Sequence, residues 1–160
     1  MRIGVISDTH AHVQNTQAAV RMLESLDVEA VLHCGDICSA EIPLLLKTWP
    51  AHFVFGNCDH DLDSLRQAIE QAGLSCYGQF GDFTLAGRRI ALLHSHDVRL
   101  FRRVTTCGDY DLVCYGHTHV AEQHRAGRTL VLNPGALYRA NPHSIAIVEL
   151  ETLTATIVPL

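Results

Sequence analysis

Aspartate, asparagine and histidine side chains gather in five short segments of this chain, and each segment follows an apolar run. Carboxylate, amide and imidazole groups are ligands that transition metals accept in proteins. Two aspartates, one asparagine and four or five histidines from these segments could bind metal. This set of about seven ligands is more than one ion usually takes, whereas two ions that share a carboxylate need about that many. The segments are SDTH (7–10), HCGD (33–36), GNCDH (56–60), LLHSH (92–96) and GHTH (116–119).

The composition of this ligand set limits the metal and the chemistry. The set holds too much nitrogen for Mg²⁺ or Ca²⁺ as the preferred ion, and it favours Mn, Fe, Co, Ni or Zn. Two such ions about 3.5–4 Å apart suit in-line displacement at phosphorus, where both the attacking and the leaving oxygen are negative. Each segment alone is explained equally well as a turn. All five together favour a dinuclear centre that hydrolyses phosphate esters.

The apolar runs that precede these segments predict the strands of an α/β fold. In the first half, runs at 3–6, 30–32 and 53–55 alternate with segments of helical spacing at 19–26, 42–49 and 62–69. This rhythm implies parallel strands with right-handed crossovers. In such sheets ligands bind beyond the carboxyl ends of the strands. We therefore expect the polar segments to converge on one site.

The second half predicts antiparallel strand pairs around one further helix. Hairpins are expected to turn at 86–87, near Gly127 and near Glu151, with a helix at 98–104 and a strand at 112–115. No linker, repeat or low-complexity stretch interrupts the sequence, so residues 1–160 are expected to form a single domain. The exposed strand edge expected near the C-terminus favours a homo-dimer or tetramer.

The bulk composition excludes several classes of protein. The chain has 160 residues, 48% of them hydrophobic, which is enough for a core without disulfides. A formal charge of −5 argues against stable nucleic-acid binding. No stretch approaches the ~18 apolar residues of a membrane span, and the first apolar run is too short for a signal peptide. We expect no membrane association, a cytoplasmic location and reduced cysteines.

In combination, the motifs D-x-H, G-D, G-N, H-x-H and G-H-T-H resemble those of the calcineurin-like metallophosphoesterase superfamily. The short length and the cysteine after Asn57 narrow the resemblance to the small YfcE-like phosphodiesterase group. It covers nearly the whole chain, from ISDTH (6–10) to NPGA (133–136). It implies an α/β fold, a four-layer αββα sandwich of two mixed β-sheets flanked by helices, which holds two divalent metal ions.

The resemblance also assigns ligands and a mechanism to this chain. One ion would be bound by Asp8, His10, Asp36 and His119, and the other by Asp36, Asn57, His94 and His117. A hydroxide bridging the ions would attack phosphorus. Manganese is the expected metal, with Fe, Zn, Ni or Co as alternatives. Catalysis is expected to depend on Asp36, Asn57, Cys58, His60 and His94.

Cys58 stands where many members of the superfamily carry a histidine that protonates the leaving oxygen. A thiol beside two cations tends towards thiolate and is a poorer acid, which favours diesters whose leaving groups need little protonation. His60 is the candidate substitute acid. A tolerated small residue without a chemical role is the alternative interpretation of Cys58.

The phosphate is expected to meet Asn57, His96 and Arg139, although a solvated surface arginine explains Arg139 equally well. Close relatives tend to have glycine where Ser95 separates His94 from His96, so the position of His96 is less defined than that of His94. The leading interpretation is a phosphodiesterase for a small phosphodiester. A phosphomonoesterase for a small metabolite remains open, as does an interaction scaffold of the same fold, like a subunit of retromer.

Overall fold

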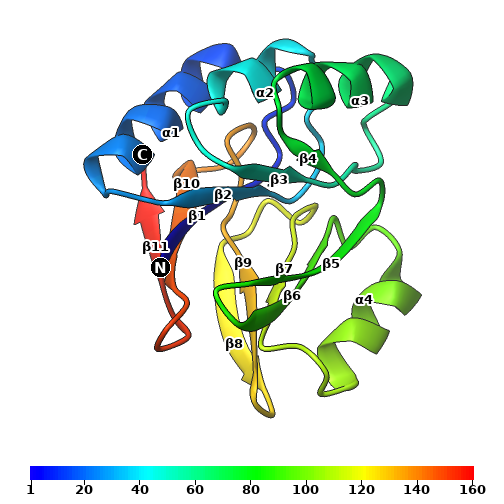
Figure 1. Ribbon diagram of the computed structural model, residues 1–160, viewed down its shortest axis with the longest axis vertical. Helices are drawn as coiled ribbons and strands as arrows, with labels where there is room; N and C mark the ends of the chain where they lie inside the picture. The colour runs from blue at the N-terminus through cyan, green and yellow to red at the C-terminus, as the bar shows by residue number, and fades with distance from the viewer.

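The protein, described over residues 1–160 by a computed structural model, consists of two facing β-sheets with helices on their outer sides (Figure 1). The first sheet has the strand order β11-β10-β1-β2-β3-β4. Strands β1 to β4 run parallel, and β10 and β11 extend the sheet antiparallel. Their bounds are β1 Arg2–Ile6, β2 Ala30–His33, β3 Ala51–Phe53, β4 Ser75–Cys76, β10 Ser144–Glu149 and β11 Thr154–Pro159.

The second sheet has the order β5-β6-β7-β9-β8. Its three central strands, β6, β7 and β9, are parallel, and the hairpin partners β5 and β8 form its antiparallel edges. The bounds are β5 Phe80–Leu85, β6 Arg88–Leu93, β7 Leu112–Cys114, β8 Glu122–Ala126 and β9 Thr129–Asn133. The fold is therefore the expected α/β sandwich of two mixed sheets.

Helices cover the outer face of each sheet (Figure 1). Helices α1 (Val13–Ser25), α2 (Glu41–Leu45) and α3 (Leu62–Gln71) lie over the first sheet, and α4 (Val98–Thr106) lies over the second. None of these helices is both long and apolar enough to cross a lipid bilayer.

Alternating side chains of the central strands enter two different cores. In β2, Ala30 and Leu32 pack between the two sheets, whereas Val31 packs beneath the helices. Because both faces of the strand are covered, the strand is apolar throughout rather than alternating with polar residues. This double burial produces the short continuous apolar runs of the sequence.

Two predicted elements are wrong in their bounds, and one strand was missed. The strand expected at 53–55 ends at Phe53, and Val54 and Phe55 lie in a buried loop after it. The helix expected at 42–49 ends at Leu45, because Leu46 and Trp49 each bond to a carbonyl three residues back, as in isolated turns. Trp49 is buried in the core although it lies outside the helix, so its distance from Ile42 along the chain resembled a helical repeat by coincidence. Strand β4 has two residues, too few to give a pattern.

Candidate metal centre

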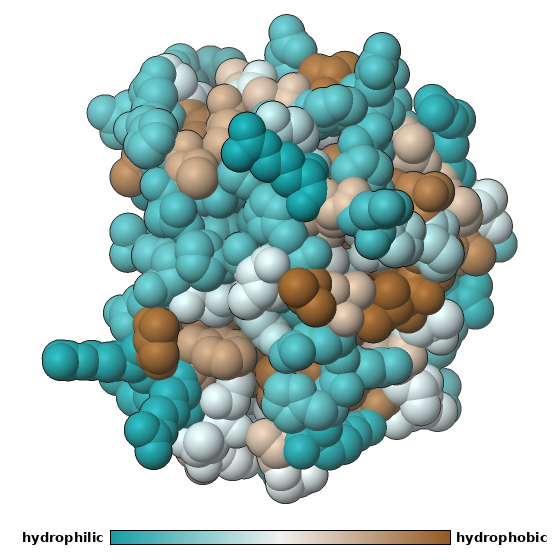
Figure 2. Space-filling view, turned by 180° about the vertical axis from the view of Figure 1, so that it is seen from behind, coloured by the Kyte–Doolittle hydropathy of each residue, from teal (hydrophilic) through white to brown (hydrophobic).

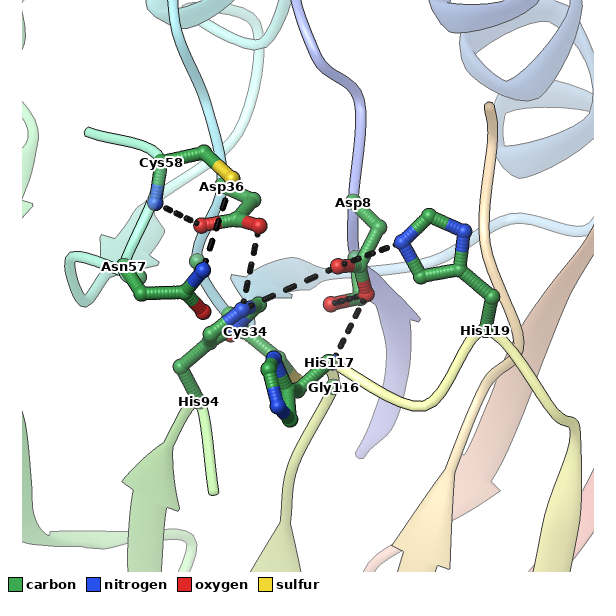
Figure 3. Close-up of polar contacts among 12 residues, drawn as sticks. Asp8, Cys34, Asp36, Asn57, Cys58, His94, Gly116, His117 and His119 are labelled. Carbon is green, nitrogen blue, oxygen red and sulfur yellow. Dashed lines mark hydrogen bonds and ion pairs between the residues drawn. The ribbon is translucent and has the colours of Figure 1, made fainter. Parts of the chain in front are cut away.

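The five polar segments follow β1, β2, β3, β6 and β7, and they meet where the carboxyl ends of both sheets face one another (Figure 3). The site is therefore shared between two sheets, each of which contributes neighbouring parallel strands. This arrangement explains how segments more than 100 residues apart in the chain reach one centre.

Two buried carboxylates and three imidazoles form the middle of the site. The Asp8 Oδ1 atom lies 3.2 Å from His119 Nε2, 3.8 Å from His94 Nε2 and 3.9 Å from His10 Nε2. The Asp36 Oδ2 atom lies 3.2 Å from His94 Nε2 and 3.5 Å from His10 Nε2. Asp36 thus lies between two histidines, as a bridging carboxylate must, and His94 faces both carboxylates.

The donor atoms of this cluster fit divalent metal ions. Asp8 Oδ1, His10 Nε2 and His94 Nε2 are buried and have no hydrogen-bond partner, although buried polar atoms almost always have one. Donor atoms of three overlapping groups each lie within 4.8 Å of one another. The groups are Asp8–His10–His119, Asp8–Asp36–His94 and His10–Asp36–Cys58. Cations held between these atoms would satisfy them, since Asp and His are ordinary ligands of transition metals.

Asn57 and His117, the remaining expected ligands, lie at the exposed side of the cluster. Both line an open cavity of about 520 Å³ together with His10, Asp36 and His119. The ring of His117 lies 5.2 Å from that of His94, centre to centre. All seven expected ligands therefore surround one location, five of them close together and two at its mouth.

Hydrogen bonds from neighbouring loops fix both carboxylates. The Ser7 hydroxyl donates to Asp8 Oδ2 at 2.5 Å, and the backbone N–H of His117 donates to the same oxygen at 3.1 Å. The N–H of Cys58 donates to Asp36 Oδ1 at 2.8 Å. One oxygen of each carboxylate is thereby held by the protein, and the other is left for a cation.

His94 is oriented in the same way. Its Nδ1–H donates to the Cys34 carbonyl at 2.8 Å, which directs Nε2 towards the carboxylates. Burial alone would raise the pKa of Asp36, but the imidazole of His94, 3.2 Å away, and the N–H of Cys58 lower it well below its usual range. Burial would lower the pKa of His94, and Asp36 and Asp8 outweigh this and raise it.

The loops that carry the ligands hold left-handed backbone conformations. Eight of the twelve non-glycine residues with positive φ belong to these loops, and such conformations cost roughly 1–3 kcal/mol each. Strain concentrated in this way is typical of functional sites, where surrounding contacts impose the geometry. The eight are Asp8, His10, Ala11, Asp36, Cys38, Ser95, His117 and His119, and Arg139 on the cavity wall also has a positive φ.

Comparison with known proteins identifies the family of this chain. A profile of the calcineurin-like phosphoesterase superfamily domain matches residues 1–153. The chain belongs to the calcineurin-like phosphoesterase superfamily. It is 29% identical over 138 residues to phosphodiesterase MJ0936 of Methanocaldococcus jannaschii, an alignment that covers 84% of this chain and 83% of the relative.

Solved structures of the superfamily agree with this assignment. An archaeal phosphodiesterase superposes with a TM-score of 0.92 at 27% identity, covering all of both chains. YfcE, a phosphoesterase from E. coli, superposes with a TM-score of 0.66 at 20% identity, covering 99% of both chains, and this likeness concerns the fold alone. The resemblance to the calcineurin-like metallophosphoesterase superfamily that the motifs predicted is confirmed.

In this phosphoesterase, Cys58 lines the cavity beside Asp36 and Asn57. Burial, followed by Asp36, raises the pKa of the Cys58 thiol to about 11. His60 is exposed and lies in an adjoining pocket, on the other side of Cys38 and Cys58. The structure therefore brings Cys58 to the expected ligands and leaves His60 outside their cavity.

The two remaining expected phosphate contacts lie on opposite sides of the site. Arg139 lines the cavity, with its guanidinium 5.1 Å from the centre of the Tyr138 ring. His96 lies outside the cavity lining, 5.6 Å from His94 between ring centres. Ser95 turns the chain between the two histidines at φ 75°, and its hydroxyl donates to the Gly116 carbonyl at 3.1 Å. The serine thereby ties together the two histidine loops.

Several residues that support the site carried no recognisable sequence signal. Asp59 is buried and accepts hydrogen bonds from the N–H groups of Gly56 and Cys38, which joins the loops after β2 and β3. Tyr138 packs on His10 at 5.3 Å between ring centres. Asp59 stands directly after Cys58 in the motif, so only the fold shows that its carboxylate points away from the metal ligands.

His33, to which the sequence motifs assign no role, joins the loops after β1 and β2. Its Nδ1 accepts from the Gly35 N–H at 3.2 Å, so its Nε2–H donates to the Thr9 hydroxyl at 3.1 Å. That hydroxyl in turn donates to the carbonyls of Asp36 and Ile37. Complete burial, followed by the charge of His94, lowers the pKa of His33 to about 3.

The buried neutral His33 predicts that acid destabilises the fold. An unfolded histidine has a pKa of about 6.5. Below that pH the unfolded chain binds a proton at His33, whereas the folded protein does not. The contribution of neutral His33 to the free energy of unfolding is complete above pH 6.5 and is lost as the pH falls towards 3, by up to about 1.4 kcal/mol per pH unit.

Urea unfolding between pH 7.5 and 5, in the presence of a chelator, measures how the free energy of unfolding depends on pH. We expect His33→Gln to reduce the slope and the exposed control His60→Gln to leave it unchanged; equal slopes in all three proteins would contradict this role.

Proposed function

We propose that this protein is a phosphodiesterase that uses two divalent transition metal ions, manganese foremost among them. The observation that carries the proposal is the convergence of five strand-end loops on buried ligand atoms without hydrogen-bond partners. Support also comes from the relatives, since MJ0936 and the archaeal structure are both named phosphodiesterases. Fe, Zn, Ni and Co suit the same nitrogen and oxygen donors.

Each expected ligand has a defined task in this proposal. Asp8, His10, Asp36 and His119 would hold one ion, and Asp36, Asn57, His94 and His117 the other. Bound ions would supply positive charge that neutralises the phosphate oxygens and makes water a nucleophile at neutral pH. The protein itself keeps Asp36 ionised and holds its oxygens and His94 in place through Cys58 and Cys34.

The substrate would lie in the open cavity beside these ligands. Arg139, packed on Tyr138, can pair with a non-bridging phosphate oxygen from the cavity wall. Asn57, exposed at the mouth, can contact the same phosphate. Cys58 lies where a proton donor would stand, and a thiol suits diesters with leaving groups that depart without full protonation. A small phosphodiester is therefore the proposed substrate.

The test compares a diester with a monoester that shares its leaving group. Purified protein is supplied with Mn²⁺ and assayed on bis-p-nitrophenyl phosphate and on p-nitrophenyl phosphate, and its bound metal is counted by mass spectrometry. We expect faster, Mn-dependent turnover of the diester. Faster turnover of the monoester would favour the phosphomonoesterase. Turnover of neither substrate, with metal bound, would favour the interaction scaffold.

Replacing Cys58 by histidine is expected to add monoesterase activity. An imidazole can protonate an alkoxide leaving group, and general acids contribute about 10²–10⁴-fold to such reactions. We expect Cys58→His to raise turnover of an alkyl monoester, glycerol 2-phosphate, at least about tenfold, with a smaller gain on p-nitrophenyl phosphate. Cys58→Ser, which offers no acid, is the matched control. Unchanged turnover in Cys58→His would mean that this position does not set the preference for diesters.

A further inference from the structure

A second cavity lies beside the metal centre, between α4 and the start of β5. It has a volume of about 460 Å³, and it is lined by Phe80, Asp97, Arg99, Leu100 and Arg103. Its floor is partly apolar, with half-buried Phe80 and Leu100, and two arginines form its rim. None of these residues belongs to the set of expected ligands or phosphate contacts.

The two arginines of this cavity have no anionic partner in the chain. Arg99 and Arg103 are one helical turn apart, about 6 Å along the axis, so they occupy the same face of α4. Like charges at this spacing repel one another. Neither guanidinium forms an ion pair or a hydrogen bond with the protein, whereas Arg2 and Arg89 each have a carboxylate partner. Figure 2 shows hydrophilic side chains extending outward at the lower left, where α4 lies in that view.

One carboxylate does line this cavity, and it is already engaged. Asp97 is the N-cap of α4, and its Oδ1 accepts from the N–H groups of Arg99 and Leu100 at 3.0 Å each. It therefore stabilises the helix N-terminus. With Asp97 counted, the cavity keeps a surplus of positive charge in a protein whose net charge is −5.

This cavity lies next to the loop that carries His94 and His96. A small cleft lined by His94, Ser95 and His96 shares Asp97 and Leu100 with it. The loop that carries the expected ligand His94, together with His96, thus lies between the cavity and the site, and α4 begins directly after that loop at Val98. Arg99 follows His96 by three residues and lies in the first turn of α4, so the arginine cavity adjoins this loop directly.

We propose that Arg99 and Arg103 form a subsite for a second anionic group of the substrate, so that the preferred substrates are phosphodiesters carrying a further phosphate beyond the scissile one. This inference rests on the proposed phosphodiesterase activity. The guanidinium groups pair with phosphate oxygens, and Phe80 offers an aromatic surface to the group that links the two phosphates.

The test uses two substrates that differ by one phosphate. Thymidine 5′-(p-nitrophenyl phosphate) and its 3′-phosphorylated form release the same p-nitrophenol, and kcat/KM is measured for both with Mn²⁺. We expect the wild-type protein to prefer the 3′-phosphorylated diester about tenfold, and Arg99→Gln/Arg103→Gln to lose that preference. Turnover of the unphosphorylated diester should remain unchanged, which shows that the variant is folded and catalytically intact.

Arg102→Gln is the matched control, because Arg102 is exposed on the same helix and does not line the cavity. The subsite is overturned by an absent preference in the wild type, by a preference that survives in the double variant, or by an equal loss in Arg102→Gln. If neither diester is cleaved, the proposed activity fails, and calorimetric binding of thymidine 3′,5′-bisphosphate decides the subsite. Equal affinities of the wild type and the double variant would then overturn it.

Discussion

Asp36→Asn is expected to lower turnover of bis-p-nitrophenyl phosphate at least about 100-fold and to reduce the metal bound by the purified protein. The substitution keeps the shape of the side chain and removes the negative charge that faces His94 at 3.2 Å and His10 at 3.5 Å. Changing a group that merely orients a metal ligand typically costs 10–100-fold in affinity or activity. Removing the charge of a carboxylate that lies between two sets of expected ligands should reduce metal affinity or activity at least as much.

Turnover and metal content, measured on the same preparations, separate the possible results. Asp63→Asn is the matched control, since Asp63 is an exposed carboxylate in the first turn of α3. The Cys58 N–H can still donate to the remaining amide oxygen, so the loop should keep its conformation, which circular dichroism of the metal-free protein checks. Full turnover in Asp36→Asn would exclude Asp36 as a shared ligand and with it the proposed pairing of metal ions.

The convergence of the expected ligands could be predicted from the sequence, because they stand at the ends of strands that follow one another in the chain. Asp8, Asp36 and Asn57 follow the successive parallel strands β1, β2 and β3. Parallel neighbours present their carboxyl ends at one edge, so residues at these ends are close together even when the strands are far apart in sequence. The bounds of β3 were the weaker part, since burial continues into Val54 and Phe55 after pairing has ended.

Residues that support the ligands were not predictable in the same way. His33 and Asp59 stand beside ligands in the motifs, and their side chains point to backbone N–H groups of neighbouring loops. A motif shows that a polar residue is present, and tertiary packing decides which atoms it faces. The sequence likewise does not show that Arg99 and Arg103 line one cavity with Phe80, which lies about twenty residues earlier in the chain.

The second large effect is expected at Gly116, the residue before the last histidine pair. A Cβ atom there would lie 2.7 Å from Asp8 Oδ2 and closer still to Ser7 Oγ, nearer than real contacts allow. These two atoms form the hydrogen bond that orients Asp8, so Gly116→Ala must displace the ligand or the loop of His117 and His119. We expect a loss of about 1–3 kcal/mol in the free energy of unfolding. Metal affinity should fall at least about tenfold.

A suppressor variant distinguishes this steric cause from a general loss of stability. Ser7→Ala removes the oxygen nearest to the added methyl group, so Gly116→Ala/Ser7→Ala should recover part of the metal affinity that Gly116→Ala loses. Gly108→Ala is the control for stability alone, because Gly108 has φ 77° and open space around it at the far end of α4. It should destabilise the fold and leave metal affinity unchanged. If Gly116→Ala binds metal as tightly as the wild type, close packing of the GHTH loop against Asp8 is not what holds that carboxylate, and the orientation of the first ligand must come from the β1 backbone instead.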